Sequence, residues 1–220
     1  MEQTSVHPVI EKVRTALGRR APLDIAPTPP AIDESITRLI YQTTGLTDLF
    51  QQRAIAMKML VEIVRCHEVA QKIAEFLKER ACKTAMLSDT PLLQKFGVTN
   101  FLNQSGISAR NWRELTADQT YDIDAGVTEA DYAIAETGTL AIRHRPEHGR
   151  LLSLVPFVHV AVIEPSIIVP DLLDFFARIT KEGTGSGMTL ISGPSKTADI
   201  EMNTVTGVHG PNVVKTFVVA

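Results

Sequence analysis

The segment richest in groups that can do chemistry runs from Gly126 to Ile142 and reads GVTEADYAIAETGTLAI. Its polar residues Asp131, Glu136, Thr137 and Thr139 interrupt an apolar pattern that otherwise predicts a buried strand. An unpaired buried carboxylate would cost several kcal/mol, so Glu136 must be solvated, paired, protonated or used in chemistry.

The motif Glu136-Thr137-Gly138-Thr139 combines a carboxylate, two hydroxyls and a glycine that permits a tight turn. The hydroxyls of Thr137 and Thr139 can bond either the backbone or a ligand. A carboxylate beside glycine can serve as a nucleophile, a general base or a hydrogen-bond acceptor for a substrate. Glu136 can equally form a structural ion pair, for example with Arg150 or Lys196.

A second polar segment, ISGPSKTAD, spans residues 191–199 and predicts a strand, a small-residue loop and the start of a helix. Amides at that helix N-terminus would favour a carboxylate or phosphate group. A simple helix cap at Ser195 or Thr197 explains the segment equally well. The ligand-binding candidates in this segment are Ser192, Gly193, Ser195, Thr197 and Asp199. No G-x-x-x-x-G-K-[ST] loop is present, and no G-x-G-x-x-G follows a strand.

Ligands of open α/β sheets bind outside the carboxyl ends of strands, so we expect these two segments to form opposite walls of one cleft. Glu201 and His209 complete the catalytic candidates with Glu136. His209 lies in the glycine-rich GVHGP stretch, where it is either an acid/base group or structural. Spacing alone assigns no Ser-His-Asp order.

The five residues Arg143, His144, Arg145, His148 and Arg150 form a local basic cluster. The cluster can hold a substrate anion, with Arg150 as the ligand-binding candidate, although we favour a solvated charged loop. Residues 144–148 also spell H-x-x-E-H, the inverted zinc-protease pattern. Because the proline at its centre makes a continuous helix unfavourable, we expect no metal site there.

These candidate residues must be positioned by an alternation of strands and helices. We expect strands over 60–64, 84–87, 133–142, 158–163, 190–192 and 213–219, with 108–115 either a strand or irregular. We expect helices over 9–17, 48–57, 68–80, 92–96, 170–179 and roughly 197–205, and helical periodicity from Asp33 onward. This order predicts an α/β fold with a mostly parallel sheet flanked by helices.

The N-terminal part of the chain has a different character. Residues 19–31 include Pro22, Pro27, Pro29 and Pro30, so they predict an extended arm. We therefore assign residues 1–31 to an N-terminal helix and proline-rich arm and residues 32–220 to the α/β domain. Such an arm can wrap its own domain or a neighbouring subunit, which makes a homodimer an expectation.

Composition restricts the partners. The chain is 44% hydrophobic and 21% charged with a net charge of −3, so no basic field predicts binding to nucleic acid or to an anionic membrane. No segment resembles a signal peptide or an apolar membrane span. Cys66 and Cys82 lack C-x-x-C spacing, which predicts reduced thiols in a cytoplasmic protein without its own iron–sulfur cluster.

Four blocks occur in one order along the chain: GVTEADYAIAETGTL, GRLLSLVPFVHVAVI, SGPSKTADIE and GVHGP. Together they resemble the LUD-domain family, in its lactate-utilisation protein C branch. The resemblance covers about residues 124–211. The chain departs from the pattern at Phe157 and in the basic insert over 143–148.

The resemblance implies a fold similar to the NagB/RpiA/CoA-transferase group and a role in a three-protein system that oxidises L-lactate to pyruvate. The partners implied are iron–sulfur lactate-utilisation proteins, which leaves this chain a non-redox component without a cofactor. Its cleft would bind a small carboxylate or other anionic ligand. The alternatives are a stand-alone CoA-transferase-like enzyme, in which Glu136 attacks an acyl-CoA, and a purely structural scaffold.

Overall fold

A computed structural model of the chain describes residues 8–18, 28, 30–31, 33–41, 44–198, 204–206 and 210–220. The chain divides into two compact units, Met1–Thr37 and Arg38–Ala220. The first unit contains the helices α1 (Pro8–Ala16) and α2 (Glu34–Thr37). The second unit contains every other element and all of the features that follow.

A six-stranded sheet runs through the centre of the second unit, and all of its strand pairs are parallel. Its order is β1 (Leu60–Val64), β12 (Val213–Val219), β7 (Val158–Ile163), β4 (Ala125–Glu129), β2 (Thr84–Leu87) and β3 (Ser108–Asn111). The central strands β7 and β12 are rich in valine and buried on both faces, as a parallel sheet covered on two sides requires.

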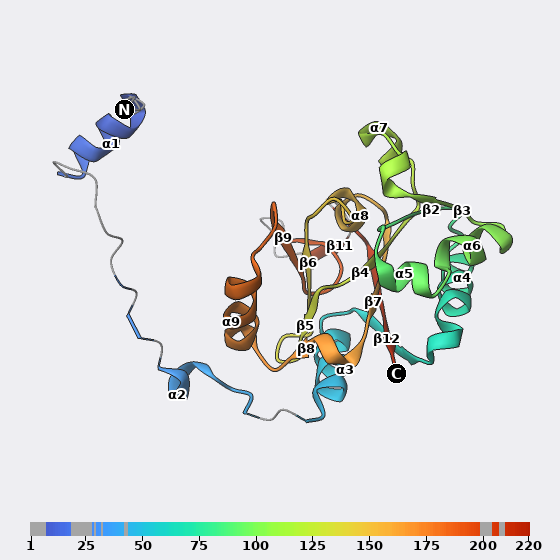
Figure 1. The fold of residues 1–220 in the computed structure, drawn as a ribbon, viewed down its shortest axis with the longest axis horizontal. Coiled ribbons are helices and arrows are strands. Elements are labelled where there is room, and N and C mark those ends of the chain that lie inside the picture. The colour runs from blue at the N-terminus through green and yellow to red at the C-terminus, as the bar shows by residue number, and fades with distance from the viewer. Residues whose placement is uncertain are drawn as a thin grey trace. The chain divides into compact units, whose positions relative to one another are not determined.

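One face of this sheet is covered by the helices α4 (Val69–Glu79), α5 (Pro91–Lys95) and α6 (Val98–Gln104), as Figure 1 shows. Helix α4 is preceded by the 3₁₀ turn η1 (Cys66–Glu68). It buries Ile73, Phe76 and Leu77 at helical spacing against this face. The largest cluster of buried apolar side chains lies between these helices and the sheet.

The opposite face is covered by a second sheet of order β8 (Ile168–Val169), β5 (Tyr132–Ile134), β6 (Thr139–Arg143) and β9 (Met188–Ile191). Helix α3 (Leu46–Ala56) packs beside it, and α9 (Leu172–Glu182) covers its outer surface (Figure 1). The connections include α7 (Ala117–Thr120), α8 (Leu151–Leu154), η2 (Trp112–Glu114) and η3 (Pro165–Ile167). The mostly parallel sheet flanked by helices confirms the predicted fold class.

Four predicted strands are found at their predicted bounds, namely β1, β2, β7 and β12. The prediction of a single strand over 133–142 is wrong, because β5 and β6 are antiparallel strands joined by a turn over 135–138. The prediction also missed β4, whose sequence AGVTE breaks the apolar pattern with a glycine and two polar residues.

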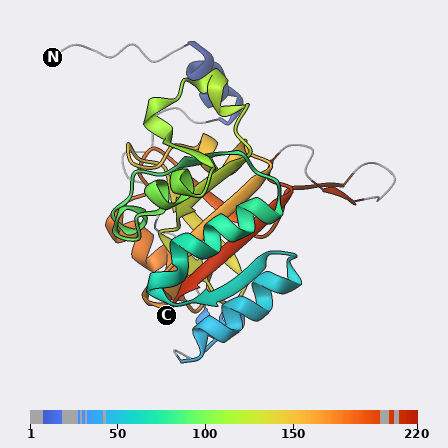
Figure 2. The ribbon, with the colours of Figure 1, turned by 90° about the vertical axis from the view of Figure 1, so that its right-hand side faces the viewer.

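The predicted helix over 197–205 is also wrong. Lys196–Ala198 forms β10 and Thr204–Thr206 forms β11, and the two pair as an antiparallel ribbon that stands out from the rest of the unit (Figure 2). The β-branched residues of these segments favour strand over helix. The helix N-terminus that we expected to attract an anion is therefore absent at this position.

Candidate ligand-binding site

A cleft of about 280 Å³ opens where β9 ends, between α8 and the start of β12. Its lining residues are Ser153, Leu154, Thr189, Leu190, Ile191, Ser192, Gly193, Pro194, Ser195, Gly210, Pro211 and Val214. Three of the predicted ligand-binding residues, Ser192, Gly193 and Ser195, therefore line one cleft. The cleft follows a strand of the smaller sheet rather than the carboxyl edge of the parallel sheet.

The two predicted polar segments meet through their hydroxyl groups. Leu140 pairs with Ile191 across β6 and β9, which brings the preceding Thr139 beside Ser192. Their Oγ1 and Oγ atoms are 2.7 Å apart, and Thr137 Oγ1 donates to Thr139 Oγ1 at 2.7 Å. A chain of three hydroxyls thus joins the turn over 135–138 to the wall of the cleft.

The glycines of both segments are explained by packing on α3. Gly138 and Gly193 have φ values of 63° and 95°, a region that favours glycine. A Cβ at Gly138 would lie 2.2 Å from the Ala54 amide nitrogen, and one at Gly193 would lie 2.2 Å from the Met57 carbonyl oxygen. The absence of a side chain at Gly138 therefore lets the turn pack against α3, and Gly138 does not line the cleft.

Glu136 and Arg150 lie apart from these hydroxyls. Glu136 is half-buried, its amide donates to the Pro170 carbonyl at 2.9 Å, and its carboxylate makes no hydrogen bond or ion pair within the described residues. Arg150 donates from Nη2 to the Ser186 carbonyl at 2.9 Å. The ion pairs of Glu136 with Arg150 or Lys196 that the sequence left open are not formed.

Of the four remaining candidates, the structure describes only the backbone of Thr197. Thr197 belongs to β10, but its side chain is not described. Asp199, Glu201 and His209 lie outside the described residues. Their assignment to catalysis or ligand binding therefore stays a prediction.

The inner wall of the cleft rests on β4 and β7. His159 in β7 lies between Gly126 of β4 and Val214 of β12 in the sheet register, so the three residues share one face. Helix α8 packs directly on Gly126, where an added Cβ would lie 1.9 Å from the Leu152 carbonyl oxygen. This close approach places Ser153, the next residue of α8, at the wall of the cleft.

Most of the unpaired buried polar side-chain atoms of the described residues belong to Ser153 at this wall and to three histidines. Six buried side-chain nitrogen and oxygen atoms of the described residues have no hydrogen-bond partner, and five of them belong to His144, His148, Ser153 and His159. The sixth is an oxygen of Glu129, at the carboxyl end of β4. Buried polar groups are normally paired, so such a concentration indicates a place for water or a ligand.

We call His144, His148 and His159 the buried histidine cluster. Burial lowers the pKa of His148 to about 4 and that of His159 to about 3, so both imidazoles are neutral near pH 7. Burial and then the charge of Arg150 lower the pKa of His144. His144 Nε2 lies 2.7 Å from Thr189 Oγ1, a residue that lines the cleft.

The basic loop that carries two of these histidines is held by hydrogen bonds to Asp131 and Asp89, so the expectation of a solvated loop is wrong. Asp131 accepts hydrogen bonds from the Arg143 backbone and from the guanidinium groups of Arg143 and Arg145. The Glu147 carbonyl accepts from the amide of Asp89 at 2.8 Å. The net of bonds buries the histidines, which the local sequence could not indicate.

The inverted zinc-protease pattern over 144–148 forms a tight turn rather than a helix, as its central proline predicted. Within the described ranges, no three His, Cys, Asp or Glu side chains gather in an arrangement suited to a metal ion. Cys66 is exposed, Cys82 is buried, and both are free.

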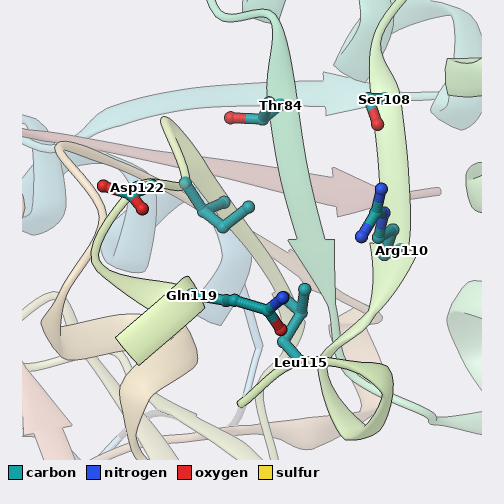
Figure 3. Close-up of a pocket in the computed structure, with 7 residues that line it drawn as sticks. Thr84, Ser108, Arg110, Leu115, Gln119 and Asp122 are labelled. Atoms are coloured by element: carbon teal, nitrogen blue, oxygen red, sulfur yellow. The ribbon is translucent and has the colours of Figure 1, made fainter. Parts of the chain in front are cut away.

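A second hollow of about 210 Å³ lies beside β2 and β3 under the connection that contains α7. Figure 3 shows Thr84 and Ser108 at one end of it and Leu115 and Gln119 at the other. Of its polar residues, Ser108, Arg110, Gln119 and Asp122 are exposed and can be satisfied by water, and the Thr84 hydroxyl donates to Asp124. We therefore take the first cleft as the candidate site.

Ser153 and His159 were missed among the candidate residues, although one of them carried a signal. His159 stands inside the run VPFVHVAVI, where a polar side chain in an otherwise apolar buried strand requires a partner. Ser153 carried no such signal, because its burial depends on where α8 packs.

No described helix is both long and apolar enough to cross a bilayer.

The chain is similar in sequence to known proteins and similar in fold to a solved structure. The protein from Halalkalibacterium halodurans named Lactate utilization protein C is 29% identical over 95% of this chain and 93% of its own length. The Escherichia coli protein YkgG is 29% identical over 92% of each chain. The crystal structure of a DUF162 family protein from Deinococcus radiodurans matches with a TM-score of 0.61 and 23% identity, covering 80% of this chain and 96% of that one.

The sequence model of the LUD domain matches residues 48–219, which include both sheets, the cleft and the buried histidine cluster. This match covers most of the chain, and the chain therefore belongs to the LUD domain family.

Proposed function

We propose that this protein is a non-redox component of an L-lactate utilisation system and that its cleft binds a small anionic ligand. The support from relatives is that proteins named Lactate utilization protein C align with nearly all of this chain. The proposed role is cytoplasmic, beside partner proteins that carry iron–sulfur clusters.

The observation that carries the ligand-binding part is the lining of the cleft. Its polar side chains are the hydroxyls of Ser153, Thr189, Ser192 and Ser195, and no carboxylate of the described residues lines it. Hydroxyls can donate hydrogen bonds to an anion without introducing a repelling charge. The volume of about 280 Å³ lies just below the usual range of ligand pockets, about 300–1,000 Å³, and suits a small molecule.

The assignment of electron transfer to partners rests on the cysteines. The chain has two cysteines, whereas a ferredoxin-type cluster is held by four thiolates. One of the two is buried, and burial raises the pKa of the Cys82 thiol to about 11, which opposes the thiolate form that ligates a metal. Partner proteins would then supply the redox centres.

Deletion of the gene in a bacterium with a single copy tests the proposal. We expect loss of growth on L-lactate, unchanged growth on glucose, and recovery when the wild-type chain is restored. Affinity purification of the restored chain should also recover proteins that contain iron–sulfur clusters. Normal growth of the deletion strain on L-lactate would contradict the proposed role.

The CoA-transferase-like alternative receives no support from the geometry. Glu136, its proposed nucleophile, does not line the cleft. Treatment with an acyl-CoA and hydroxylamine would convert a reactive Glu136 into a hydroxamate. An unmodified Glu136 in the mass spectrum would argue against this alternative.

A further inference from the structure

We propose that the second hollow, beside β2 and β3, is a binding site for a free α-amino acid with a short aliphatic side chain. The inference goes beyond the proposed function, because the hollow and the cleft share no lining residue. It assigns a further ligand site to the β2–β3 end of the parallel sheet.

The hollow carries opposite charges on its two sides. Arg110 belongs to β3, Asp122 precedes β4, and β2 lies between these two strands in the sheet. Adjacent strands are about 4.8 Å apart, so β3 and β4 are about 10 Å apart. Figure 3 shows Arg110 and Asp122 on opposite sides of the hollow. Neither side chain forms an ion pair within the described part of the chain, so the two suit a ligand that carries both charges.

Neutral hydrogen-bond donors line the hollow together with Arg110. Ser108 is two residues before Arg110 in β3, so the two side chains share a face of the strand. The Ser108 hydroxyl makes no hydrogen bond to any residue that the structure describes. Gln119 Oε1 accepts from the Thr116 amide at 2.9 Å, which leaves the NH₂ group of Gln119 as a donor. A carboxylate can accept from these donors and from the guanidinium, while Asp122 can accept from an ammonium group.

The remaining lining and the volume define the size of the ligand. Leu115 and Ile123 are half-buried and give the hollow an apolar surface on which an aliphatic side chain can pack. The volume of about 210 Å³ lies below the usual range of ligand pockets, about 300–1,000 Å³, so the ligand must be small. An amino acid combines both charges and an apolar group within that size.

The edge of β3 does not favour an added polypeptide strand as the occupant. The amide of Ala109 donates to Asn103 Oδ1, and the carbonyl of Ala109 accepts from Asn103 Nδ2, both at 3.0 Å. A strand that paired with β3 would have to displace this side chain. A small molecule in the hollow leaves the Asn103 bonds intact.

Nuclear magnetic resonance titration of the full-length chain at pH 7 with L-leucine tests the inference. Two comparators each lack one charge: 4-methylpentanoate lacks the ammonium group, and 3-methylbutylamine lacks the carboxylate. We expect L-leucine to shift the amide signals of Ser108 and Arg110 and to bind at least tenfold more tightly than either comparator. The amide signals of Ser192 and Ser195 in the cleft should not shift.

Two variants identify which charge each side of the hollow recognises. Arg110→Gln should bind L-leucine no more tightly than the wild-type chain binds 3-methylbutylamine. Asp122→Asn should bind L-leucine no more tightly than the wild-type chain binds 4-methylpentanoate. Both residues are exposed, so we expect both variants to fold, and a thermal melt checks this.

Arg178→Gln on α9 and Asp118→Asn on α7 are the matched controls, because both residues are exposed and neither lines the hollow. Both controls should keep the tenfold preference for L-leucine. Equal affinity of the wild-type chain for L-leucine and either comparator would overturn the inference, and so would unshifted amide signals at Ser108 and Arg110. An unchanged affinity for L-leucine in folded Arg110→Gln or Asp122→Asn would also overturn it. These results would leave the proposed function standing, because growth on L-lactate tests that function separately.

Discussion

The two faces of the parallel sheet are built from the same strands but have different chemistry. On the face under α4, α5 and α6, residues such as Val127, Val160 and Phe217 form one apolar core. On the face under the smaller sheet, the alternate positions include Gly126, Thr128 and His159. Five of the six unpartnered buried polar atoms of the described residues belong to His144, His148, Ser153 and His159, of which Ser153 lines the cleft and His159 lies on this second face.

This difference indicates that one face of the sheet mainly stabilises the fold and that the other face is the one suited to recognise a ligand. The apolar face can be optimised by packing alone, because it contains almost no group that needs a specific partner. The second face carries buried groups that lower stability unless something binds them. The following predictions test whether changes on the two faces have these separate consequences.

The largest expected effect is a loss of stability on the apolar face. Leu77→Ala should lower the free energy of unfolding by about 2–5 kcal/mol, because Leu77 is fully buried in the core and the change leaves a cavity. Urea denaturation measures the loss. Leu190→Ala, at a half-exposed position of the cleft, should cost much less, and an equal cost at both positions would contradict the comparison.

The next effect is expected where α8 packs on β4. Gly126→Ala should cost about 1–3 kcal/mol, because the new Cβ would lie 1.9 Å from the Leu152 carbonyl oxygen and must displace the helix. Pyruvate affinity should fall with it, since α8 carries Ser153. A Cβ added at Gly45 would have no atom within 4 Å. Gly45→Ala should therefore strain only its own backbone and leave the affinity for pyruvate unchanged. A loss of affinity in both variants would contradict a specific role of this contact.

The buried histidine cluster should make stability depend on pH. The unfolded histidines take up protons below about pH 6.5, whereas the folded pKa values of His148 and His159 are about 4 and about 3. The unfolded state therefore gains protons first, and the folded state loses stability as the pH falls from about 6.5 toward 4. The expected slope is about 1.4 kcal/mol per pH unit for each histidine.

His148→Gln should remove the contribution of one histidine from that slope. Unfolding in urea at pH 7.5, 6 and 5 gives the comparison, with the wild-type chain as the reference for every other titrating group. If the variant and the wild-type chain lose stability in parallel, His148 is not held neutral by burial.

The smallest loss of stability is expected at Ser153. Ser153→Ala should not lower the free energy of unfolding and should raise it by up to about 1–3 kcal/mol, because the buried hydroxyl it removes has no partner. Thr128→Val, which leaves His159 Nε2 unpaired, should cost about 1–3 kcal/mol. Chemical denaturation of both variants checks the contrast, and a larger loss in Ser153→Ala would mean that its hydroxyl is already satisfied.

The sequence predicted those parts of the fold that are determined by local pattern. The runs over 158–163 and 213–219 are continuous and apolar, so their strands were found at the correct bounds. The strand β4 was missed because Gly126 makes room for α8 and Thr128 bonds His159, and both reasons are tertiary. The turn over 135–138 was hidden by the same apolar pattern.

The candidate site was predicted in part for comparable reasons. Ser192 and Ser195 were recognised because small polar residues follow a strand. The helix expected after them was wrong, because the β10–β11 ribbon takes its place. Ser153 could not be found, since its neighbours along the chain do not reveal that it lies at the wall of a cleft.

Nuclear magnetic resonance of the full-length chain, labelled in its imidazole nitrogens and in its leucine and valine methyl groups, tests the central claim most directly. Saturating pyruvate or L-lactate should shift the imidazole signals of His144 and His159. The methyl signals of Leu77 and Val160 on the apolar face should stay within error. Unshifted imidazole signals, or equal shifts on the two faces, would contradict the claim that the second face ends in a ligand-binding cleft.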